Sequence, residues 1–252
     1  MEKEINNLQN RFRDLADKSY TQNIYTFSSF LSLAEQDAFL QMERELGHVR
    51  WQLFGGTTDC ERKMLRFGCV DDLGYEEDYP IACIHICPLL KKFSDDFSHR
   101  DFLGALMNLG IERSTLGDIF LKDKEAYLFC QESLTDFICE KLDRVKHTNV
   151  RCERILADTE LEMNSPEPVE ITVSSERADS VVAKLYHLSR EKSQQLFAEK
   201  KIYVDGRLTE NLSRILKDGE LVTVRGFGRF LYRGMKYETK KGKLCVCAEV
   251  YR

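Results

Sequence analysis

The sequence predicts an α+β fold divided into several domains, and three observations support this. The chain has 252 residues, about twice the size of a typical domain, so two or three domains are expected. Apolar residues make up 42% of the chain and charged residues 31%, which is enough hydrophobic material for folded cores. Helical spacing of apolar residues dominates the N-terminal part, whereas strand and helix patterns alternate from Ile81 onward.

Residues 1–75 are predicted to form a helical N-terminal region with short strands. Apolar residues at helical spacing occur first at Ile5, Leu8, Phe12 and Leu15, then at Leu33, Phe39, Leu40 and Leu46. A helix is expected to begin after Ser32, because Glu35 three residues later completes a capping-box pattern. Trp51–Phe54 and Met64–Val70 flank the Gly55-Gly56 pair and predict short strands around a turn.

Residues 76–157 are predicted to form a domain with the order β-α-β-β-α-β. The expected segments are a strand at Ile81–Cys87, a helix at Arg100–Leu109, two strands within Gly117–Cys130, a helix at Glu132–Val145 and a strand at Val150–Ile155. This is the ferredoxin-like or RRM-like order. Such sheets can bind RNA through exposed aromatic residues, but no run here matches that aromatic signature. We therefore expect Tyr127 and Phe129 to be packing residues.

Residues 158–170 are predicted to be a linker, because they contain Pro166 and Pro168 and lack apolar periodicity.

The net charge of the chain changes sign near this point. Residues 170–252 contain 17 Lys and Arg against 11 Asp and Glu, whereas residues 1–169 contain 20 against 31. A basic module attached to an acidic body indicates that one end binds a polyanion. A merely solvated basic surface is the alternative interpretation.

Residues 171–252 are predicted to form the basic module, with the order α-α-β-turn-β. Two helices are expected at Arg177–Leu188 and Arg190–Glu199, with Ser189 capping the second. Strand and turn patterns follow at Ile202–Arg207 and Leu216–Val224. Helix N-termini and basic side chains gathered on one face would favour phosphate binding there.

A basic segment follows the predicted helices and strands. Arg225–Lys243 contains seven basic residues against one acid, Glu238, and four interleaved aromatic residues: Phe227, Phe230, Tyr232 and Tyr237. This composition is typical of nucleic-acid binding. A basic β-hairpin with core aromatic residues is the alternative, and the two interpretations can both hold.

The C-terminal module resembles the S4 RNA-binding domain. The matching residues are Arg177, Asp179, Leu185, Ser189, Arg190, Leu196, Val204, Gly206, Leu216, Gly219 and Val222–Gly226. The resemblance implies an RNA-binding surface formed by the two helices and the next strand. Two positions depart from the pattern. Lys200 replaces a frequent glycine, so a positive φ is expected there, and Asp205 places a negative charge near the surface.

The resemblance extends over nearly the whole chain to the bacterial YlmH family. It is carried by Glu61–Lys63, Ser98–Ile111, Gly117–Ile119 and the stretch Arg225-Gly-Phe-Gly-Arg-Phe230. It implies a helical N-terminal region, an RRM-like middle domain and a C-terminal S4 domain. It also implies binding to rRNA of the large ribosomal subunit and to tRNA or peptidyl-tRNA in ribosome-associated quality control. The family has further been connected with cell division.

The candidate site residues follow from the S4 resemblance and the basic composition. The predicted RNA-binding residues are Arg177, Lys184, Ser189, Arg190, Lys192, Gln194, Lys200, Lys201, Arg207, Arg214, Arg225, Arg229 and Arg233. The candidate second contact in the middle domain consists of His99, Arg100 and Arg113. Ser98 and Asp101 flank two of these residues in a helix-start pattern, so we expect Asp101 to act first in capping.

Two other classes of site, an enzyme active site and a metal site, are alternatives for this sequence. An RNA-modifying enzyme carrying an S4 domain would need a catalytic part, but the sequence contains no P-loop, no methyl-donor glycine loop and no synthase Arg-Leu-Asp motif. Cys83, His85 and Cys87 alternate along a predicted strand, as Cys245 and Cys247 do, so a metal site is conceivable. Buried cysteine packing is the ordinary alternative, and we predict no catalytic residues, no metal and no cofactor.

The remaining expectations concern partners and location. Nine cysteines without a Cys-x-x-Cys pair fit a reduced cytoplasm better than a disulfide framework. The apolar run Ile81–Leu90 is too short to span a membrane, so no membrane partner is predicted. No DNA partner is expected either. No coiled-coil heptad indicates a dimer, and a monomer is expected. The open alternative is a protein-interaction scaffold, for example in cell division, with auxiliary RNA affinity.

Overall fold

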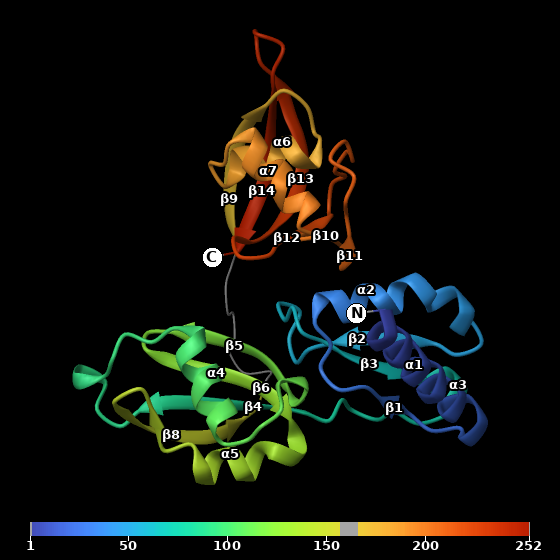
Figure 1. Ribbon diagram of the computed structural model, residues 1–252, viewed down its shortest axis with the longest axis vertical. Coiled ribbons are helices and arrows are strands. Elements are labelled where there is room, and N and C mark those ends of the chain that lie inside the picture. Colours follow the sequence, from blue (N-terminus) through green and yellow to red (C-terminus); the bar gives the residue numbers. More distant parts are fainter. Residues whose placement is uncertain (1, 157–165, 252) are drawn as a thin grey trace. The chain divides into compact units, whose positions relative to one another are not determined.

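The computed structural model describes residues 2–156 and 166–251, without the side chains of residues 2 and 3. These residues form two compact units, one on each side of the undescribed stretch (Figure 1). Helices and antiparallel sheets occur in both units. The predicted α+β class is therefore confirmed. Within the described residues, no helix is long and apolar enough to cross a membrane.

The N-terminal part of the first unit packs helices against a small sheet. Its elements are α1 (Glu2–Gln22), β1 (Thr26–Phe27), α2 (Leu33–Met42), the 3-10 helix η1 (Glu43–Leu46), β2 (Trp51–Phe54), β3 (Met64–Phe67) and α3 (Val70–Leu73). The strands have the order β1-β3-β2. The rings of Phe12 in α1 and Phe39 in α2 pack in a T-shaped, edge-to-face arrangement, with 5.4 Å between ring centres. The predicted capping box is present, because Ser32 N donates to Glu35 Oε2 at 2.7 Å.

The middle part contains the predicted order β-α-β-β-α-β with additional short elements. They are β4 (Ile81–Pro88), η2 (Lys91–Phe93), α4 (His99–Asn108), η3 (Arg113–Thr115), β5 (Leu116–Lys122), β6 (Glu125–Gln131), η4 (Glu132–Leu134), α5 (Thr135–Lys141), β7 (Arg144–Val145) and β8 (Thr148–Ile155). The sheet order is β5-β6-β4-β8-β7, with every pair antiparallel. Figure 1 shows α4 and α5 beside this sheet. Phe102 of α4 and Ile138 of α5 belong to the same buried cluster as Ile84 of β4.

The predicted helix Glu132–Val145 is too long at its C-terminal end. The structure ends α5 at Lys141, and Leu142 has ψ 86. Val145 instead pairs with Thr148 in the β7–β8 hairpin, whose turn contains Lys146 at φ 53. Leu142 and Val145 are both buried in the core of the middle part. Leu142 is thus buried from a loop and Val145 from a strand. The spacing of apolar residues alone could not distinguish these two positions from positions in a helix.

The N-terminal part covers the second face of the middle sheet. Phe30, Cys60 and Met64 form one buried cluster with Cys83 and Phe129 of the sheet. Gly56 lies so close that a Cβ there would be 2.2 Å from Cδ1 of the Phe129 ring. Phe129 has no exposed surface, so its predicted packing role is confirmed. Aromatic stacking of RNA on this residue would require the N-terminal part to move away.

Half-buried polar groups join the same two parts. The Arg62 guanidinium donates to the carbonyl oxygens of Phe30 and Leu116, each at 2.9 Å. Asp118 Oδ2 accepts from the backbone N–H of Arg62 at 3.1 Å and also from that of Glu61. Burial lowers the pKa of Arg62, because desolvation disfavours its charge. These directional bonds fix how residues 61–62 sit against β5.

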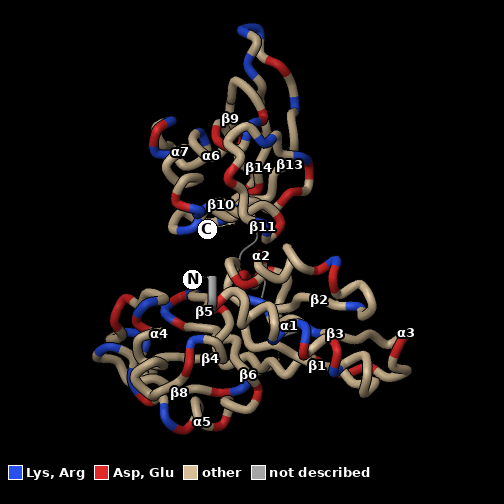
Figure 2. Tube along the Cα trace, turned by 45° about the vertical axis from the view of Figure 1, so that its right-hand side comes forward, with Lys and Arg blue, Asp and Glu red and all other residues tan. Residues whose placement is uncertain are grey.

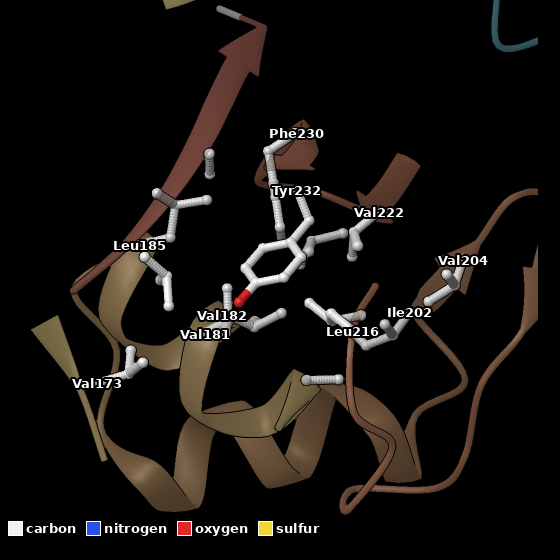
Figure 3. Packing of buried hydrophobic residues seen from close by; sticks show 14 of the residues in the cluster. Val173, Val181, Val182, Leu185, Ile202, Val204, Leu216, Val222, Phe230 and Tyr232 are labelled. Carbon is white, nitrogen blue, oxygen red and sulfur yellow. The ribbon is translucent and has the colours of Figure 1, made fainter. Parts of the chain in front are cut away.

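The second unit is one six-stranded antiparallel sheet with two helices. Its elements are β9 (Glu167–Val173), α6 (Ala178–Leu185), α7 (Arg190–Ala198), β10 (Ile202–Val204), β11 (Arg207–Leu208), β12 (Leu221–Val224), β13 (Gly228–Glu238) and β14 (Leu244–Tyr251). The strand order is β11-β10-β12-β13-β14-β9. Figure 3 shows Val181 and Val182 of α6 facing Phe230 and Tyr232 of β13 across the core. Tyr232 Oη, at the edge of this core, donates to Glu176 Oε1 at 2.7 Å.

Part of the predicted linker is a strand. Residues 158–165 lie outside the described residues, but Glu167–Glu170 begin β9, which pairs with β14 from Val250 to Leu244. The expectation of a linker through Glu170 is therefore wrong at its C-terminal end. Pro168 lies on an edge strand of the sheet, where a missing N–H donor is tolerated. The sequence pattern alone could not show that this acidic stretch has a strand partner far along the chain.

Candidate nucleic-acid interface

A surface pocket along α6 brings together three of the predicted RNA-binding residues. Its volume is about 570 Å³. Arg177, Lys184 and Arg190 line it together with Ser174 and Ser175. One buried carboxylate, that of Asp179, is also in the wall. We refer to this site as the α6 pocket. Its basic and hydroxyl groups suit an anion, because they can donate several hydrogen bonds from three segments of chain.

Arg177 is oriented by a two-point bond to Asp179. Nε of Arg177 donates to Oδ1 of Asp179 at 3.0 Å, and Nη2 donates to Oδ2 at 2.9 Å. The Asp179 side chain is 4% exposed, whereas that of Arg177 is 33% exposed. A guanidinium has five N–H groups, so this pair leaves further donors on Arg177 for a ligand. The buried carboxylate thus holds the guanidinium in place at the entrance of α6.

The second helix begins at the other end of the α6 pocket. Ser189 is its N-cap, and its Oγ accepts a hydrogen bond from the backbone N–H of Lys192 at 3.1 Å. The predicted cap is therefore confirmed. Lys192 Nζ donates to Gln195 Oε1 at 3.0 Å on the exposed side of α7. Ser193 Oγ donates to Asp179 O at 2.9 Å, so a buried bond fixes α7 against α6 and sets the position of Arg190.

Sequence reasoning missed several polar residues that line the α6 pocket, among them Ser174, Ser175 and His187. The adjacent serines before the helix start were a usable signal, since hydroxyl and N–H groups at such positions favour anions. His187 carries no comparable signal. Its place depends on the left-handed backbone after α6, where its φ is 54. Gln194, which was predicted, lies half-buried on α7 and does not line the pocket.

The predicted arginines of β13 lie on the other face of the sheet. Phe230 and Tyr232 point into the helix-covered core, so the alternating residues Arg229 and Arg233 point to the opposite side. The Arg229 guanidinium lies 4.4 Å from the centre of the Tyr251 ring. Arg233 Nη2 forms an ion pair with Glu249 Oε2 at 2.9 Å. The structure therefore does not unite these two residues with the α6 pocket.

Arg225 lies in the turn between β12 and β13. Its backbone N–H donates to Lys201 O at 2.9 Å, and its side chain is exposed. The next residue, Gly226, has φ 89, a conformation that glycine adopts without strain. The Phe227 ring contacts that of Tyr186 at 5.7 Å, which joins this turn to the end of α6. Arg225 is thus at the border of the helix side of the unit.

The other predicted cations of this unit form local ion pairs or lie at the far end of the sheet. Lys200 Nζ is 3.5 Å from Glu210 Oε1, and Lys201 Nζ is 2.6 Å from Glu199 Oε2. Lys200 has φ 57, which confirms the predicted positive value. Arg207 is exposed on the edge strand β11. Arg214 pairs with the mostly buried Glu220, with 2.8 Å between Nη2 and Oε1.

The four aromatic residues of the basic segment were predicted either to bind nucleic acid or to pack in a core, and the structure shows two in each kind of position. Phe230 and Tyr232 are fully buried in the core of the unit. Phe227 is 40% exposed and Tyr237 is 56% exposed. The structure therefore supports the core interpretation for the first pair, whereas the second pair offers rings at the surface.

The three residues of the candidate second contact in the middle part have different surroundings. His99 and Arg100 are exposed at the start of α4. Arg113 is half-buried, and its Nη1 donates to the carbonyl oxygens of Leu116 and Gly117 at 2.7 and 3.1 Å. Burial, together with the nearby charge of Arg62, lowers the pKa of Arg113 to about 10. Arg113 thus binds backbone of its own chain, and we leave it out of the proposed RNA contacts.

Asp101 acts at the helix start as expected. Its Oδ2 accepts hydrogen bonds from the Ser98 hydroxyl and the Ser98 backbone N–H, each at 2.7 Å. Lys146 Nζ lies 3.0 Å from the same oxygen. The Ser98 hydroxyl, followed by Lys146, lowers the pKa of Asp101 to about 2. The helix-start role of Asp101 is therefore confirmed.

Two of the candidate metal ligands on β4 have ordinary protein surroundings. Cys83 is buried in a hydrophobic cluster, and His85 contacts neighbouring side chains. Burial raises the pKa of the Cys83 thiol to about 12, so the neutral thiol is favoured. His85 stacks on Tyr127, with 4.9 Å between ring centres, and its Nε2 lies 2.8 Å from Glu125 Oε2. In the part of the chain that the structure describes, no group of three or more His, Cys, Asp or Glu residues is arranged to hold a metal ion.

Comparison with known proteins decides the family. The model of the family described as "Putative RNA-binding domain in YlmH" matches residues 75–159. A Bacillus subtilis (strain 168) protein named "Ribosome-associated protein quality control protein P2" is 32% identical over 178 residues, which are 69% of this chain and 67% of that protein. The chain belongs to the YlmH family. The predicted resemblance is therefore confirmed, and the family description itself concerns RNA binding.

A solved structure, "Cell division protein ylmH from Streptococcus pneumoniae", is also similar. It covers 60% of this chain and 91% of its own, with a TM-score of 0.49 and 14% identity. The matched YlmH RNA-binding model spans the middle part of the chain, whereas the α6 pocket lies in the other unit. This YlmH family member thus has candidate RNA contacts in both units.

Proposed function

We propose that this protein binds RNA without catalysing a reaction, and that its ligands are large-subunit rRNA and tRNA or peptidyl-tRNA in ribosome-associated quality control. The observation that carries the proposal is the α6 pocket, where Arg177, Lys184 and Arg190 meet. We further propose an RRM-like middle domain and an S4-type C-terminal domain, acting in the cytoplasm. The name of the Bacillus subtilis relative supports the ribosomal setting.

The pocket would bind phosphate groups of an RNA backbone. Arg177 enters with a fixed orientation, because buried Asp179 holds it by two hydrogen bonds. Arg190 adds a second planar fork at the start of α7, and Lys184 adds a mobile point charge between them. Phosphate contacts of this kind position a protein on RNA but carry no base information. The proposed action is therefore positional: it stabilises one placement of tRNA relative to the large subunit.

The experiment that tests this proposal is sedimentation of cell lysate through a sucrose gradient. We expect the wild-type protein to travel with free large subunits and Arg190→Glu to remain in the soluble fractions. Arg44→Glu is the matched control, because Arg44 is exposed in the other unit and the change in charge is the same. Retention of Arg190→Glu on large subunits at the wild-type level would contradict the assignment of the α6 pocket.

A second function is favoured by an exposed apolar loop in the middle part. Leu89, Leu90 and Phe93 are 60%, 67% and 78% exposed and lie within five residues of each other after β4. Clustered exposed apolar side chains often mark protein contacts. An interaction scaffold of this kind would bind its partner through the loop and use RNA only as auxiliary affinity. It predicts a protein complex that survives high salt and is insensitive to Arg190→Glu but is lost in Leu90→Ser/Phe93→Ser.

A further inference from the structure

The long hairpin of β13 and β14 ends in a turn of five residues, Thr239–Lys243. The last strand pairs are Tyr237 with Cys245 and Glu238 with Leu244. Figure 1 shows this hairpin projecting as the narrow red tip of the C-terminal unit. Lys240, Lys241 and Lys243 are all exposed. The lysine side chains of the turn therefore do not pack in the core, and they are accessible to a ligand.

The turn has a defined shape. Thr239 N donates to Lys243 O at 2.7 Å, and Gly242 N donates to Thr239 O at 2.9 Å. In addition, Lys243 N donates to the Thr239 hydroxyl at 3.0 Å. Gly242 has φ 70, which glycine adopts at little steric cost. A turn closed by three hydrogen bonds presents its side chains with less conformational freedom to lose on binding.

The charge of the turn is of one sign. Three of its five residues are lysines, and residues 239–243 contain no Asp or Glu. Figure 2 shows this tip in blue. Lower on the hairpin, Lys236 is paired with Glu170, with 2.6 Å between Nζ and Oε1. Lysine binds phosphate as a flexible point charge, without demanding a particular geometry. The tip is thus suited to a polyanion whose charges are repeated, such as a nucleic-acid backbone.

The sheet pairing places the tip next to the α6 pocket. Leu244, the first residue of β14 after the turn, pairs with Val173 at the end of β9. Val173, Ser174 and Ser175 line the α6 pocket. The chain therefore leaves β9 for the pocket at the same end of the sheet where the hairpin tip begins. A polyanion held in the pocket has the lysines of the tip as its neighbour.

We propose that the turn Thr239–Lys243 is a second phosphate-binding element for RNA, which extends the contact made by the α6 pocket. This inference rests on the proposed RNA-binding function. The ligand class is the sugar-phosphate backbone of structured RNA, and each lysine neutralises one phosphate without selecting a base. The exposed Tyr237 ring lies at the foot of the turn, where an unpaired base could stack on it.

The test uses the full chain and fluorescently labelled total tRNA, with affinity measured over a series of KCl concentrations. We expect Lys240→Ala/Lys241→Ala/Lys243→Ala to weaken binding about ten- to a hundredfold at low salt. The slope of log affinity against log salt should become shallower by about two to three, because about one counterion is released per phosphate contact. Replacement of the same three lysines by arginine should keep both quantities near the wild-type values.

Two controls make the result specific. Arg11→Ala/Lys18→Ala/Arg44→Ala removes the same charge from exposed positions outside the matched residues 75–159, and it should bind as the wild type does. An equal loss in this variant would overturn the proposal, because net charge would then explain the effect. Lysines also protect open strand edges from pairing. Self-association of the tip variant on size-exclusion chromatography, with tRNA affinity unchanged, would overturn the proposal in favour of that role.

The test separates this inference from the proposed function. If Arg190→Glu loses tRNA binding and the tip variant does not, the pocket assignment stands and the inference about the tip is wrong. If the tip variant alone loses binding, the tip is supported and the pocket assignment fails. If the wild-type protein does not bind tRNA or large subunits at all, both proposals are wrong.

Discussion

Arg177 and Asp179 form a two-point ion pair across the first turn of α6, with hydrogen bonds of 3.0 and 2.9 Å. The carboxylate is almost completely buried, whereas the guanidinium faces the α6 pocket. Asp179 therefore orients the guanidinium of Arg177, and Arg177 remains available to a ligand.

Replacing Asp179 with asparagine should loosen the start of α6. The change removes the charge that holds Arg177 and leaves one acceptor oxygen, so one of the two hydrogen bonds from Arg177 is lost. We expect the unit to lose about 1–3 kcal/mol of stability, which is less than for a fully buried pair because Arg177 is partly exposed. Hydrogen exchange of the α6 amides, followed by mass spectrometry, measures this locally. Wild-type protection of these amides would show that the pair does not stabilise α6.

The salt dependence of RNA binding should report how many phosphates the protein contacts. If about five are neutralised, the slope of log affinity against log salt should be roughly −3.5 to −4.5. Arg190→Ala should make this slope shallower by about one. Fluorescence anisotropy with labelled tRNA measures both values. A slope near zero for the wild type would mean that phosphate contacts contribute little, contrary to the proposed function.

Stability should fall in acid partly because of Asp101. The folded state lowers the pKa of Asp101 to about 2 from its ordinary value of 3.8, so between these values the unfolded chain binds more protons. The contribution of Asp101 is therefore present above about pH 4 and is lost as the pH falls toward 2. Asp101→Asn should show a weaker decline of the thermal midpoint over this range. Identical pH profiles for the two proteins would contradict the capping role.

Gly56→Ala should weaken the packing of the N-terminal part on the middle sheet. A Cβ at Gly56 would lie 2.2 Å from the Phe129 ring, and the backbone has φ 110. We expect a loss of about 2–4 kcal/mol from overpacking and backbone strain together. Gly74→Ala is the control, because Gly74 also has a positive φ of 76 but open space around it. Urea unfolding followed by Trp51 fluorescence compares the two. Equal losses would show that the contact with Phe129 is unimportant.

Features defined by residues close in sequence could be predicted without the structure. The capping boxes of Ser32 with Glu35 and Ser98 with Asp101 each involve two residues three positions apart. The positive φ of Lys200 likewise follows from its place just after a helix. Such features depend on local backbone geometry, so their sequence signals are complete in themselves. The order of strands and helices in the middle part was predictable for the same reason, since periodicity is a local property.

Features that depend on distant segments were decided by the tertiary structure. Glu167–Glu170 form a strand only because β14, more than 70 residues later, supplies the partner. The basic residues were predicted as one set, but strand alternation places Arg229 and Arg233 on the face opposite the helices. Arg113 is occupied by carbonyl groups of its own chain. By itself, the sequence determined which residues are basic and which segments carry a complete local signal for a helix or strand. Sheet pairing and burial, which join residues far apart in the chain, decided which of those charges can meet one ligand.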